Sequence, residues 1–259
     1  MKGSGSDPWI KLRRWTTARI ALGRTGPSLP TGAVLEFALA HALARDAVHA
    51  VLDAAVIERG LQELNLEMIE IESDASDRAV FLRRPDFGRR LSKISRAALE
   101  GRKFPPCDLA IIIGDGLSAI AVERHSVSVV GAMLAQLAPL GLTLAPVVLA
   151  RGARVALGDE IGSLLKARIA VVLIGERPGL SSPDSLGAYL TFDPRPGRTD
   201  AERNCVSNIR PAGLSYERAA VKLAWLVREA LRRSLSGVDL KDESDPLGAS
   251  ASATALSHD

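Results

Sequence analysis

Short runs of Ile, Val and Leu alternate along this chain with segments of helical length, and this order limits the folds it can adopt. The runs lie at residues 66–72, 109–113, 142–149 and 169–174, with a further one at Tyr189–Phe192. Helices are expected between and after them, at residues 86–99, 117–137, 160–167 and 216–235. The runs are apolar instead of alternating with polar residues, which is typical of a parallel sheet covered on both faces. The sequence therefore predicts an α/β fold with a Rossmann-like, doubly wound, mainly parallel sheet.

The segment before the first run predicts an N-terminal helical lobe. Between Thr31 and Leu64 apolar residues recur at helical spacing, and Pro30-Thr31 makes a suitable helix start. The two ends of the chain are instead polar or rich in small residues, a composition that cannot bury a core. The expected organisation is a flexible N-terminus at residues 1–16, a helical lobe at 17–65, a Rossmann-like domain at 66–236 and a disordered tail at 237–259.

The charge and composition exclude several classes of protein. The 33 basic and 30 acidic residues give a net charge of only +3, which is too small to produce the positive electrostatic field of a nucleic-acid-binding protein. Only 4% of residues are aromatic, so the aromatic side chains on which nucleic-acid bases stack are not indicated either. No apolar run reaches the ~18 residues of a membrane span, and charges interrupt the N-terminal segment where a secretion signal would need an apolar core. The sequence predicts a cytosolic protein that binds neither nucleic acid nor a membrane.

The sequence indicates no metal site and no catalytic residue. Cys107 and Cys205 stand in unlike contexts, without a CxxC pair or a histidine at metal-ligand spacing, so neither a disulfide framework nor zinc is indicated. The motifs of serine hydrolases, P-loop NTPases and zinc proteases are missing too. His125 is interpreted as a residue of a helix face. We therefore expect the chain to bind a ligand or partner without supplying an acid or base of its own.

A glycine-rich turn follows the second apolar run. Gly114-Asp-Gly-Leu-Ser-Ala119 satisfies the fingerprint of dinucleotide-binding folds, in which glycines let the backbone approach a phosphate. The acidic residue that should hold the ribose at the end of the next strand is missing, and Arg151 stands there, where it could receive a 2′-phosphate. Two interpretations stay open: an NADP-linked oxidoreductase that uses Gly114 and Gly116, or a tight strand-to-helix turn.

Polar residues follow the apolar strand at Ile169–Gly175. Glu176 comes directly after it, where the carboxyl ends of parallel strands form a ligand crevice, so a ligand contact and an ion pair with Arg177 are both open. A second polar stretch at residues 198–211 has no helical or alternating apolar period and is predicted to be a loop over the same crevice. It carries Cys205, which could be an inert buried thiol, although its polar neighbours favour a ligand contact.

These polar segments also carry a family resemblance. The strings IGERPGLSSPDSLGAY and RTDAERNCVSNIRP, together with LGRTGPSLPT and DLAIIIGDGLS, resemble the small (light) subunit of adenosylcobalamin-dependent ethanolamine ammonia-lyase. The resemblance extends over residues 17–236, essentially the whole folded part. It implies a carbon–nitrogen lyase that is active only with a large subunit, in a hetero-oligomer that deaminates ethanolamine to acetaldehyde and ammonia by radical chemistry.

The resemblance also implies how the cofactor is held. In the family, the residues that match Val155, Glu176 and Cys205 belong to the cobalamin site, which lies between the two subunits. The Asp-x-His-x-x-Gly motif of many cobalamin proteins is absent, which implies a base-on adenosylcobalamin. A scaffold that binds a partner without touching the ligand is a third interpretation of the chain. The N-terminal extension looks short, so the sequence leaves open whether the enzyme is packaged in a bacterial microcompartment.

Overall fold

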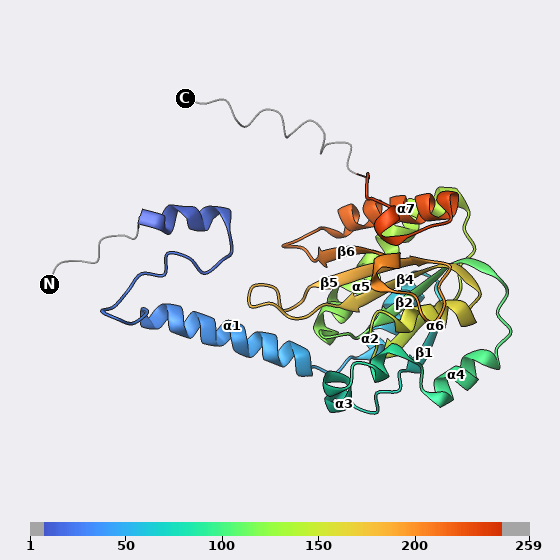
Figure 1. Ribbon diagram of the computed structural model, residues 1–259, viewed down its shortest axis with the longest axis horizontal. Helices are drawn as coiled ribbons and strands as arrows, with labels where there is room; N and C mark the ends of the chain where they lie inside the picture. Colours follow the sequence, from blue (N-terminus) through green and yellow to red (C-terminus); the bar gives the residue numbers. More distant parts are fainter. Residues whose placement is uncertain (1–7, 245–259) are drawn as a thin grey trace, which may run out of the picture.

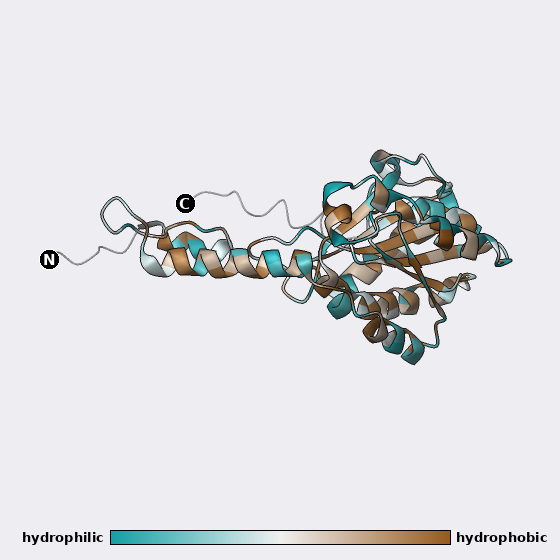
Figure 2. Ribbon diagram, turned by 90° about the horizontal axis from the view of Figure 1, so that it is seen from below, coloured by the Kyte–Doolittle hydropathy of each residue, from teal (hydrophilic) through white to brown (hydrophobic). Residues whose placement is uncertain are grey.

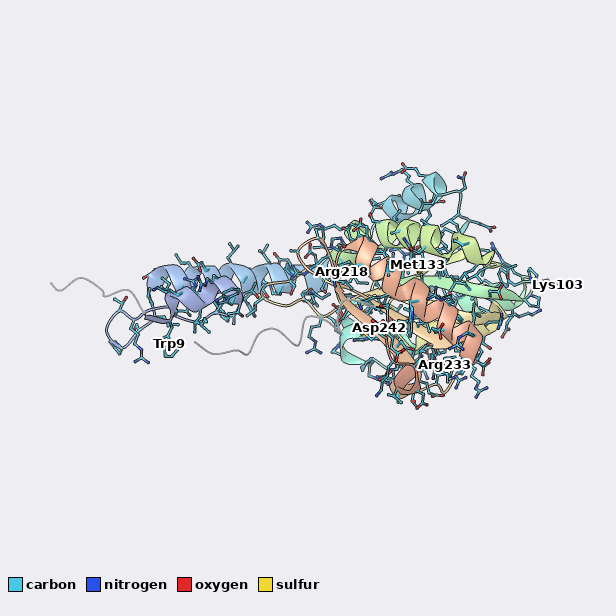
Figure 3. All side chains as sticks on the ribbon, turned by 90° about the horizontal axis from the view of Figure 1, so that it is seen from above. Trp9, Lys103, Met133, Arg218, Arg233 and Asp242 are labelled. Atoms are coloured by element: carbon cyan, nitrogen blue, oxygen red, sulfur yellow. The ribbon has the colours of Figure 1, made fainter. Side chains whose placement is uncertain are left out.

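The computed structural model describes residues 8–244 of the chain as an elongated arm joined to a layered body (Figure 1). The arm, residues 8–50, consists of the 3-10 helix η1 (Pro8–Trp15) and the long helix α1 (Thr31–His49). The body, residues 51–244, contains the sheet and the remaining helices. The helical N-terminal segment is thus present, but α1 extends away from the body, so that Trp9 and Lys103 lie at opposite ends of the molecule (Figure 3).

The body is built on a six-stranded sheet with the strand order β1-β3-β2-β4-β5-β6. The strands are β1 (Met68–Glu72), β2 (Cys107–Gly114), β3 (Val147–Arg151), β4 (Ala167–Gly175), β5 (Leu186–Phe192) and β6 (Arg203–Ile209). The first four are parallel, whereas β5 and β6 are antiparallel to their neighbours. The predicted α/β class is confirmed, with a mixed sheet. β1 lies at the edge beyond β3, an order that differs from the 3-2-1-4-5-6 of dinucleotide-binding folds.

Helices cover both faces of the sheet and give it two hydrophobic cores. On one face lie α2 (Ala54–Glu63), α5 (Ala119–Leu137) and α7 (Tyr216–Arg233), and on the other lie α4 (Lys93–Glu100) and α6 (Leu157–Leu164). Leu109 and Ala110, neighbours in β2, belong to opposite cores, and both are fully buried. This double burial explains why the central strands are continuous apolar runs, and Figure 2 shows them in the interior. The shorter elements are α3 (Arg78–Arg83), η2 (Phe87–Arg89), η3 (Ala138–Leu140), η4 (Asp200–Glu202) and η5 (Gly237–Asp239).

Two of the differences between predicted and observed element boundaries have a visible local cause. β3 begins at Val147 and not at residue 142. Thr143, ahead of the strand, donates two hydrogen bonds to the Asp108 carboxylate, and these hold the segment outside the β3 pairing. The helix expected at residues 86–99 is divided into η2 and α4, since α4 begins after Ser92, whose hydroxyl accepts a hydrogen bond from the Ser95 N–H as an N-cap.

The largest difference concerns the polar stretch that contains Cys205. Its prediction as a loop is wrong, because Arg203–Ile209 form the edge strand β6, paired with β5. Leu186 pairs with Ile209 and Ala188 pairs with Val206, so β6 carries an extra residue, which is a β-bulge. The polar stretch therefore belongs to the sheet itself and is held in register beside β5.

The chain stays packed on the body beyond α7. Leu240 is 1% exposed, and the Asn204 side-chain amide donates to the carbonyl oxygens of Gly237 and Leu240. Folded structure thus continues past residue 237, where the predicted tail begins, because Leu240 completes a core beside β6. The remaining parts of the predicted flexible ends, residues 1–7 and 245–259, lie outside the described residues. Within the described part, no helix is long and apolar enough to span a bilayer.

Candidate functional site

A hollow at the carboxyl ends of β2 and β4 is the candidate site. β2 leads into α5 on one face of the sheet and its neighbour β3 leads into α6 on the other face, so the chain connections diverge between β2 and β3. Such a divergence opens a crevice, which is where open α/β sheets bind their ligands. The hollow has a volume of about 430 Å³ and is lined by residues 116–117, 154–155 and 174–177 and by Tyr189. We call it the switch hollow.

Glu176 lines the switch hollow immediately after β4. Its backbone N–H donates to the Ser185 carbonyl oxygen (2.9 Å), and its Oε2 accepts hydrogen bonds from the Ser185 hydroxyl and from the Asn208 N–H (3.2 Å). These bonds hold the carboxylate between the β4–β5 loop and the end of β6. Among residues 8–244 the Glu176 carboxylate forms no ion pair with Arg177 or another basic side chain, so the ion-pair interpretation is not supported.

Val155 forms an apolar wall of the same hollow. It lies in the short connection between β3 and α6 and packs against the core under α4 and α6. Ile174, the penultimate residue of β4, lines the hollow with it. The fold thus brings Val155 and Glu176, which are distant in the sequence, to one site.

Cys205 lies beside the switch hollow and is not part of its lining. It pairs across the sheet edge with Tyr189, which does line the hollow. Cys205 is an exposed free cysteine, so it is not the buried thiol that the alternative interpretation assumes. Partial desolvation raises the pKa of this thiol and the Glu176 charge acts in the same direction, against the opposing hydrogen bond with Tyr189. The thiol therefore stays protonated and is a weak hydrogen-bond donor.

Tyr189 is the site residue that the sequence does not reveal. Burial raises the pKa of its hydroxyl, and the hydrogen bond with Cys205 and the charge of Glu176 add to this effect. The side chain therefore offers a neutral ring with a polar tip to the switch hollow. Tyr189 lies next to Cys205 because β5 pairs with β6. A sequence analysis that predicts a loop at β6 cannot predict this pairing.

The glycine-rich turn after β2 packs against the chain itself. Gly116 has a left-handed backbone with φ of 56°, and a Cβ there would lie 2.3 Å from the Gly175 carbonyl oxygen. The Leu117 N–H donates to that oxygen (2.9 Å), and the hydroxyl of Ser118, the N-cap of α5, donates to the Pro183 carbonyl oxygen (3.0 Å). The β4–β5 loop thus covers the N-terminus of α5, where a dinucleotide phosphate would bind.

Arg151 is engaged as well. Its guanidinium forms an ion pair with Glu70 and donates to the Leu52 carbonyl oxygen (3.1 Å), so it is not available for a 2′-phosphate. Together with the covered helix end, this favours the tight turn over the NADP interpretation of the Gly114 and Gly116 motif.

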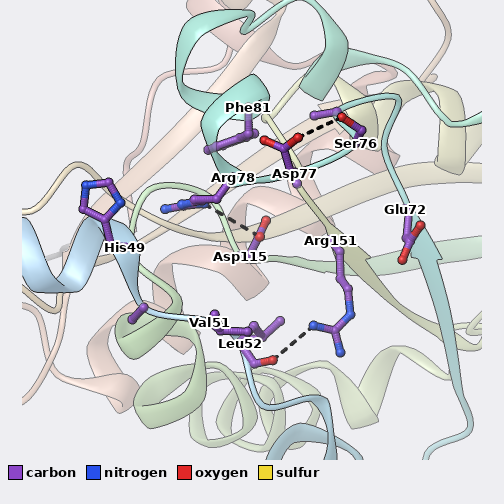
Figure 4. A pocket seen from close by; sticks show the side chains of 13 residues that line it. His49, Val51, Leu52, Glu72, Ser76, Asp77, Arg78, Phe81, Asp115 and Arg151 are labelled. Carbon is purple, nitrogen blue, oxygen red and sulfur yellow. Dashed lines mark hydrogen bonds and ion pairs between the residues drawn. The ribbon is translucent and has the colours of Figure 1, made fainter.

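A second cavity of about 240 Å³ lies where the arm meets the ends of β1 and β3 (Figure 4). Asp77 caps α3 there, and Asp115 accepts a hydrogen bond from the Ala153 N–H (2.9 Å) and lies 3.8 Å from Arg78. Burial raises the pKa of the Asp115 carboxyl, against the effect of these partners. Its polar groups mostly satisfy one another, so this cavity is a weaker candidate than the switch hollow. In the described part of the chain, no group of three His, Cys, Asp or Glu side chains could hold a metal ion.

Comparison with known proteins gives the family. A sequence model of the family described as ethanolamine ammonia-lyase light chain (EutC) matches residues 6–241. The ethanolamine ammonia-lyase small subunit of Bradyrhizobium diazoefficiens is 59% identical over 238 residues, which cover 92% of this chain and 91% of that protein. Those of Xanthomonas campestris pv. campestris and Pseudomonas putida are each 56% identical, over 246 and 242 residues, and each alignment covers 92% of this chain and 89% of the relative.

The match includes both the arm and the switch hollow, and it extends through nearly the whole chain. This chain belongs to the ethanolamine ammonia-lyase light-chain family and is the small subunit of a lyase.

Proposed function

We propose that this chain binds adenosylcobalamin in the switch hollow, at its interface with a large subunit. The assembled enzyme converts ethanolamine to acetaldehyde and ammonia by radical deamination, for which the bound cofactor supplies the chemistry. One observation carries the proposal: Val155 and Glu176, which the family resemblance assigns to the cobalamin site, line one hollow, with Cys205 beside it.

The groups around the switch hollow suit a corrinoid, which has an apolar ring face and amide side chains along its rim. Val155 and Ile174 present apolar surface. Glu176 uses Oε2 for its protein contacts, and among the described residues its Oε1 has no hydrogen-bond partner, so it can accept a bond from an amide. The Tyr189 hydroxyl and the Cys205 thiol add weaker polar groups at the same edge.

The tasks of this chain are to hold, orient and shield the cofactor. The Ser185 and Asn208 bonds fix the Glu176 carboxylate in advance, so a further hydrogen bond costs little reorganisation. The walls of the hollow exclude water from one side of the cofactor, and the large subunit covers the other side and holds the substrate pocket. None of the residues that line the hollow, all within the described part of the chain, is a histidine, which supports a base-on cofactor.

The arm supports a large partner. Leu35, Leu39 and Leu43 follow at four-residue spacing on one side of α1 and are 64%, 62% and 50% exposed. We call them the leucine stripe. The arm leaves the body at the carboxyl edge of the sheet, because its end lines the second cavity and Arg19 Nη2 donates to the Leu180 carbonyl oxygen (3.5 Å) of the β4–β5 loop. A partner that covers the switch hollow would also meet this side of the molecule. Since the relatives are named small subunits, we identify that partner as the large subunit.

The test is a titration of adenosylcobalamin into the complex of this chain with a co-expressed large subunit. Glu176→Ala removes a charged acceptor, whose hydrogen bond is worth about 1.5–3 kcal/mol, so cofactor affinity should fall about ten- to hundredfold. Cys205→Ala should cost much less, because a thiol is only a weak donor.

Glu58→Ala is the matched control, since Glu58 is an exposed carboxylate on α2 and does not line the switch hollow. Thermal melts of each complex exclude misfolding. Unchanged cobalamin affinity in a well-folded Glu176→Ala complex would show that Glu176 only fastens the β4–β5 loop to β6, and the proposed site would be wrong.

A further inference from the structure

Most arginines that line the two hollows beside the start of α6 are neutralised by a carboxylate. Arg90 pairs with Asp74 at 2.9 Å and Arg198 pairs with Asp193 at 2.8 Å. A buried pair is formed by Arg203, on β6, and an aspartate at the start of α6. Arginines in this region are therefore normally paired, and exceptions need a reason.

Three arginines around Val155 are exceptions. Arg89, Arg154 and Arg177 form no ion pair with any residue between 8 and 244, and we call them the arginine cluster. Arg154 and Arg177 line the switch hollow, and Arg89 lines an adjoining hollow together with Arg154 and Val155. The cluster thus surrounds one wall of the proposed cofactor site.

Arg154 is the half-buried member of the cluster and is held in place by neutral contacts. Its guanidinium lies 4.1 Å above the Phe81 ring, and its Nη2 donates to the Phe81 carbonyl oxygen (3.2 Å). A Cβ added at Gly88 would lie 2.8 Å from Arg154 Cγ, so this glycine makes room for the side chain. The Nε of Arg154 is buried and has no hydrogen-bond partner among the described residues.

The charge around Arg154 is unbalanced. Burial lowers the pKa of its guanidinium, and the positive charges of Arg78, Arg89 and Arg177 lower it further, with only Asp115 opposing them. Cations held together in a partly desolvated place are unfavourable unless an anion joins them. An arginine with an unused buried donor and two cationic neighbours is suited to a group with several acceptor oxygens, such as a phosphate.

We propose that the arginine cluster binds the phosphodiester of the nucleotide tail of the cofactor, the group that links the corrin side chain to the benzimidazole ribose. This inference rests on the proposed function, because it places the corrin beside Val155 and Glu176 in the same hollow. The phosphodiester is the one anionic group of cobalamin's nucleotide tail, and Arg154, next to Val155 in the chain, is the half-buried arginine of the lining. Acidic residues of the large subunit are the competing partner, and the experiment separates the two.

The experiment compares two corrinoids on the assembled complex with the large subunit. Adenosylcobalamin carries the nucleotide tail, whereas adenosylcobinamide has the same ring and adenosyl group but lacks the phosphodiester, ribose and base. Arg154→Gln should weaken adenosylcobalamin binding about ten- to hundredfold, as for a lost bond between charged groups, and should change adenosylcobinamide binding by less than about twofold. Binding is followed by the corrin absorbance spectrum, without turnover.

Three further variants make the result specific. Arg177→Gln alters an exposed side chain that forms no hydrogen bond or ion pair in the described part of the chain, so it tests the cluster even where Arg154→Gln impairs folding. Arg154→Lys keeps the charge but not the planar fork and should restore part of the affinity. Arg102→Gln is the matched control, because Arg102 is 54% exposed and lies ahead of β2 at the amino edge of the sheet.

The outcomes are distinct. Equal losses for both corrinoids would overturn the inference, because the cluster would then shape the hollow without contacting the phosphodiester. Unchanged affinity for both, with weaker association of the two subunits, would assign the cluster to acidic groups of the large subunit and would also overturn it. Failure of the unmodified complex to bind either corrinoid would instead refute the proposed function itself.

Discussion

The arm and the body use the same amino acids in opposite ways. In the body, Leu109, Leu173 and Leu223 are completely buried, whereas the leucine stripe of the arm is half or more exposed. Val34 and Phe37 are exposed on α1 too, so this helix is apolar on more than one side. A helix of that kind is normally buried against other protein. The body can therefore be stable by itself, while the apolar surface of the arm is stabilised only when a partner covers it.

The same substitution should therefore have different consequences in the two regions. Leu173→Ala leaves a cavity in the sheet core and should lower the free energy of unfolding by about 2–5 kcal/mol. Leu39→Ala removes little buried contact from the free chain and should lower it by less than about 0.5 kcal/mol. Urea denaturation of the chain without its partner measures both values. Similar losses for both variants would mean that the arm folds onto the body in solution, and the contrast between a buried body core and an exposed arm would be wrong.

Assembly should show the reverse order. Burying a leucine side chain is worth about 1.5–3 kcal/mol, so Leu35→Ser combined with Leu39→Ser should weaken association with the large subunit about a hundredfold or more. Ile94→Ser is the control, because Ile94 is 85% exposed but lies on α4 of the body. Calorimetric titration of one subunit with the other gives both affinities. Normal binding to the large subunit, together with a loss of self-association, would assign the leucine stripe to a second copy of this chain.

The elements that the sequence predicts well are those whose burial is simple. α1, α5 and α7 keep a helical period over many residues, and β2 and β4 are buried on both faces, so their apolar runs are continuous. β6 breaks both patterns. Its bulge places Val206 and Ile209 inward at a spacing of three residues, and Arg203 is buried on the opposite face by an aspartate of α6. No period of two survives, so the segment resembles a loop in sequence.

The candidate site follows the same division. Glu176 could be placed from the sequence because it comes directly after an apolar strand, and the carboxyl ends of parallel strands form ligand crevices. Tyr189 and Arg154 could not, because their roles depend on which strands pair and on which arginines lack a carboxylate. Those are properties of the folded arrangement, and neither leaves a local pattern in the chain.

The smallest expected effect concerns the contact between α5 and α7 in the body. His125 is 3% exposed, and its Nδ1 lies 2.8 Å from the hydroxyl of Tyr216 at the start of α7. Burial lowers the pKa of the imidazole, against the Asp184 carboxylate, whose Oδ2 lies 3.6 Å from Nε2. Arg124 pairs with the same carboxylate at 2.9 Å and also lowers the pKa of His125. The neutral ring is therefore the form that fits between the two helices.

We expect the body to lose stability as the pH falls from about 7 to about 5, because of His125. In the unfolded chain this histidine takes up a proton near its ordinary pKa of about 6.5, whereas the folded chain takes it up only at lower pH. Between those two pKa values the unfolded state binds more protons than the folded state. The free energy of unfolding therefore decreases as the pH is lowered, and it levels off once the folded protein is protonated as well. His125→Asn keeps a polar partner for Tyr216 and does not titrate. The free energy of unfolding of this variant should therefore change less between pH 7 and pH 5 than that of the unmodified protein. The difference should be about 1.4 kcal/mol for each unit by which burial lowers the pKa of His125. Urea denaturation of both proteins at several pH values in this range measures the difference. Parallel curves would show that the acid sensitivity of the body comes from groups other than His125.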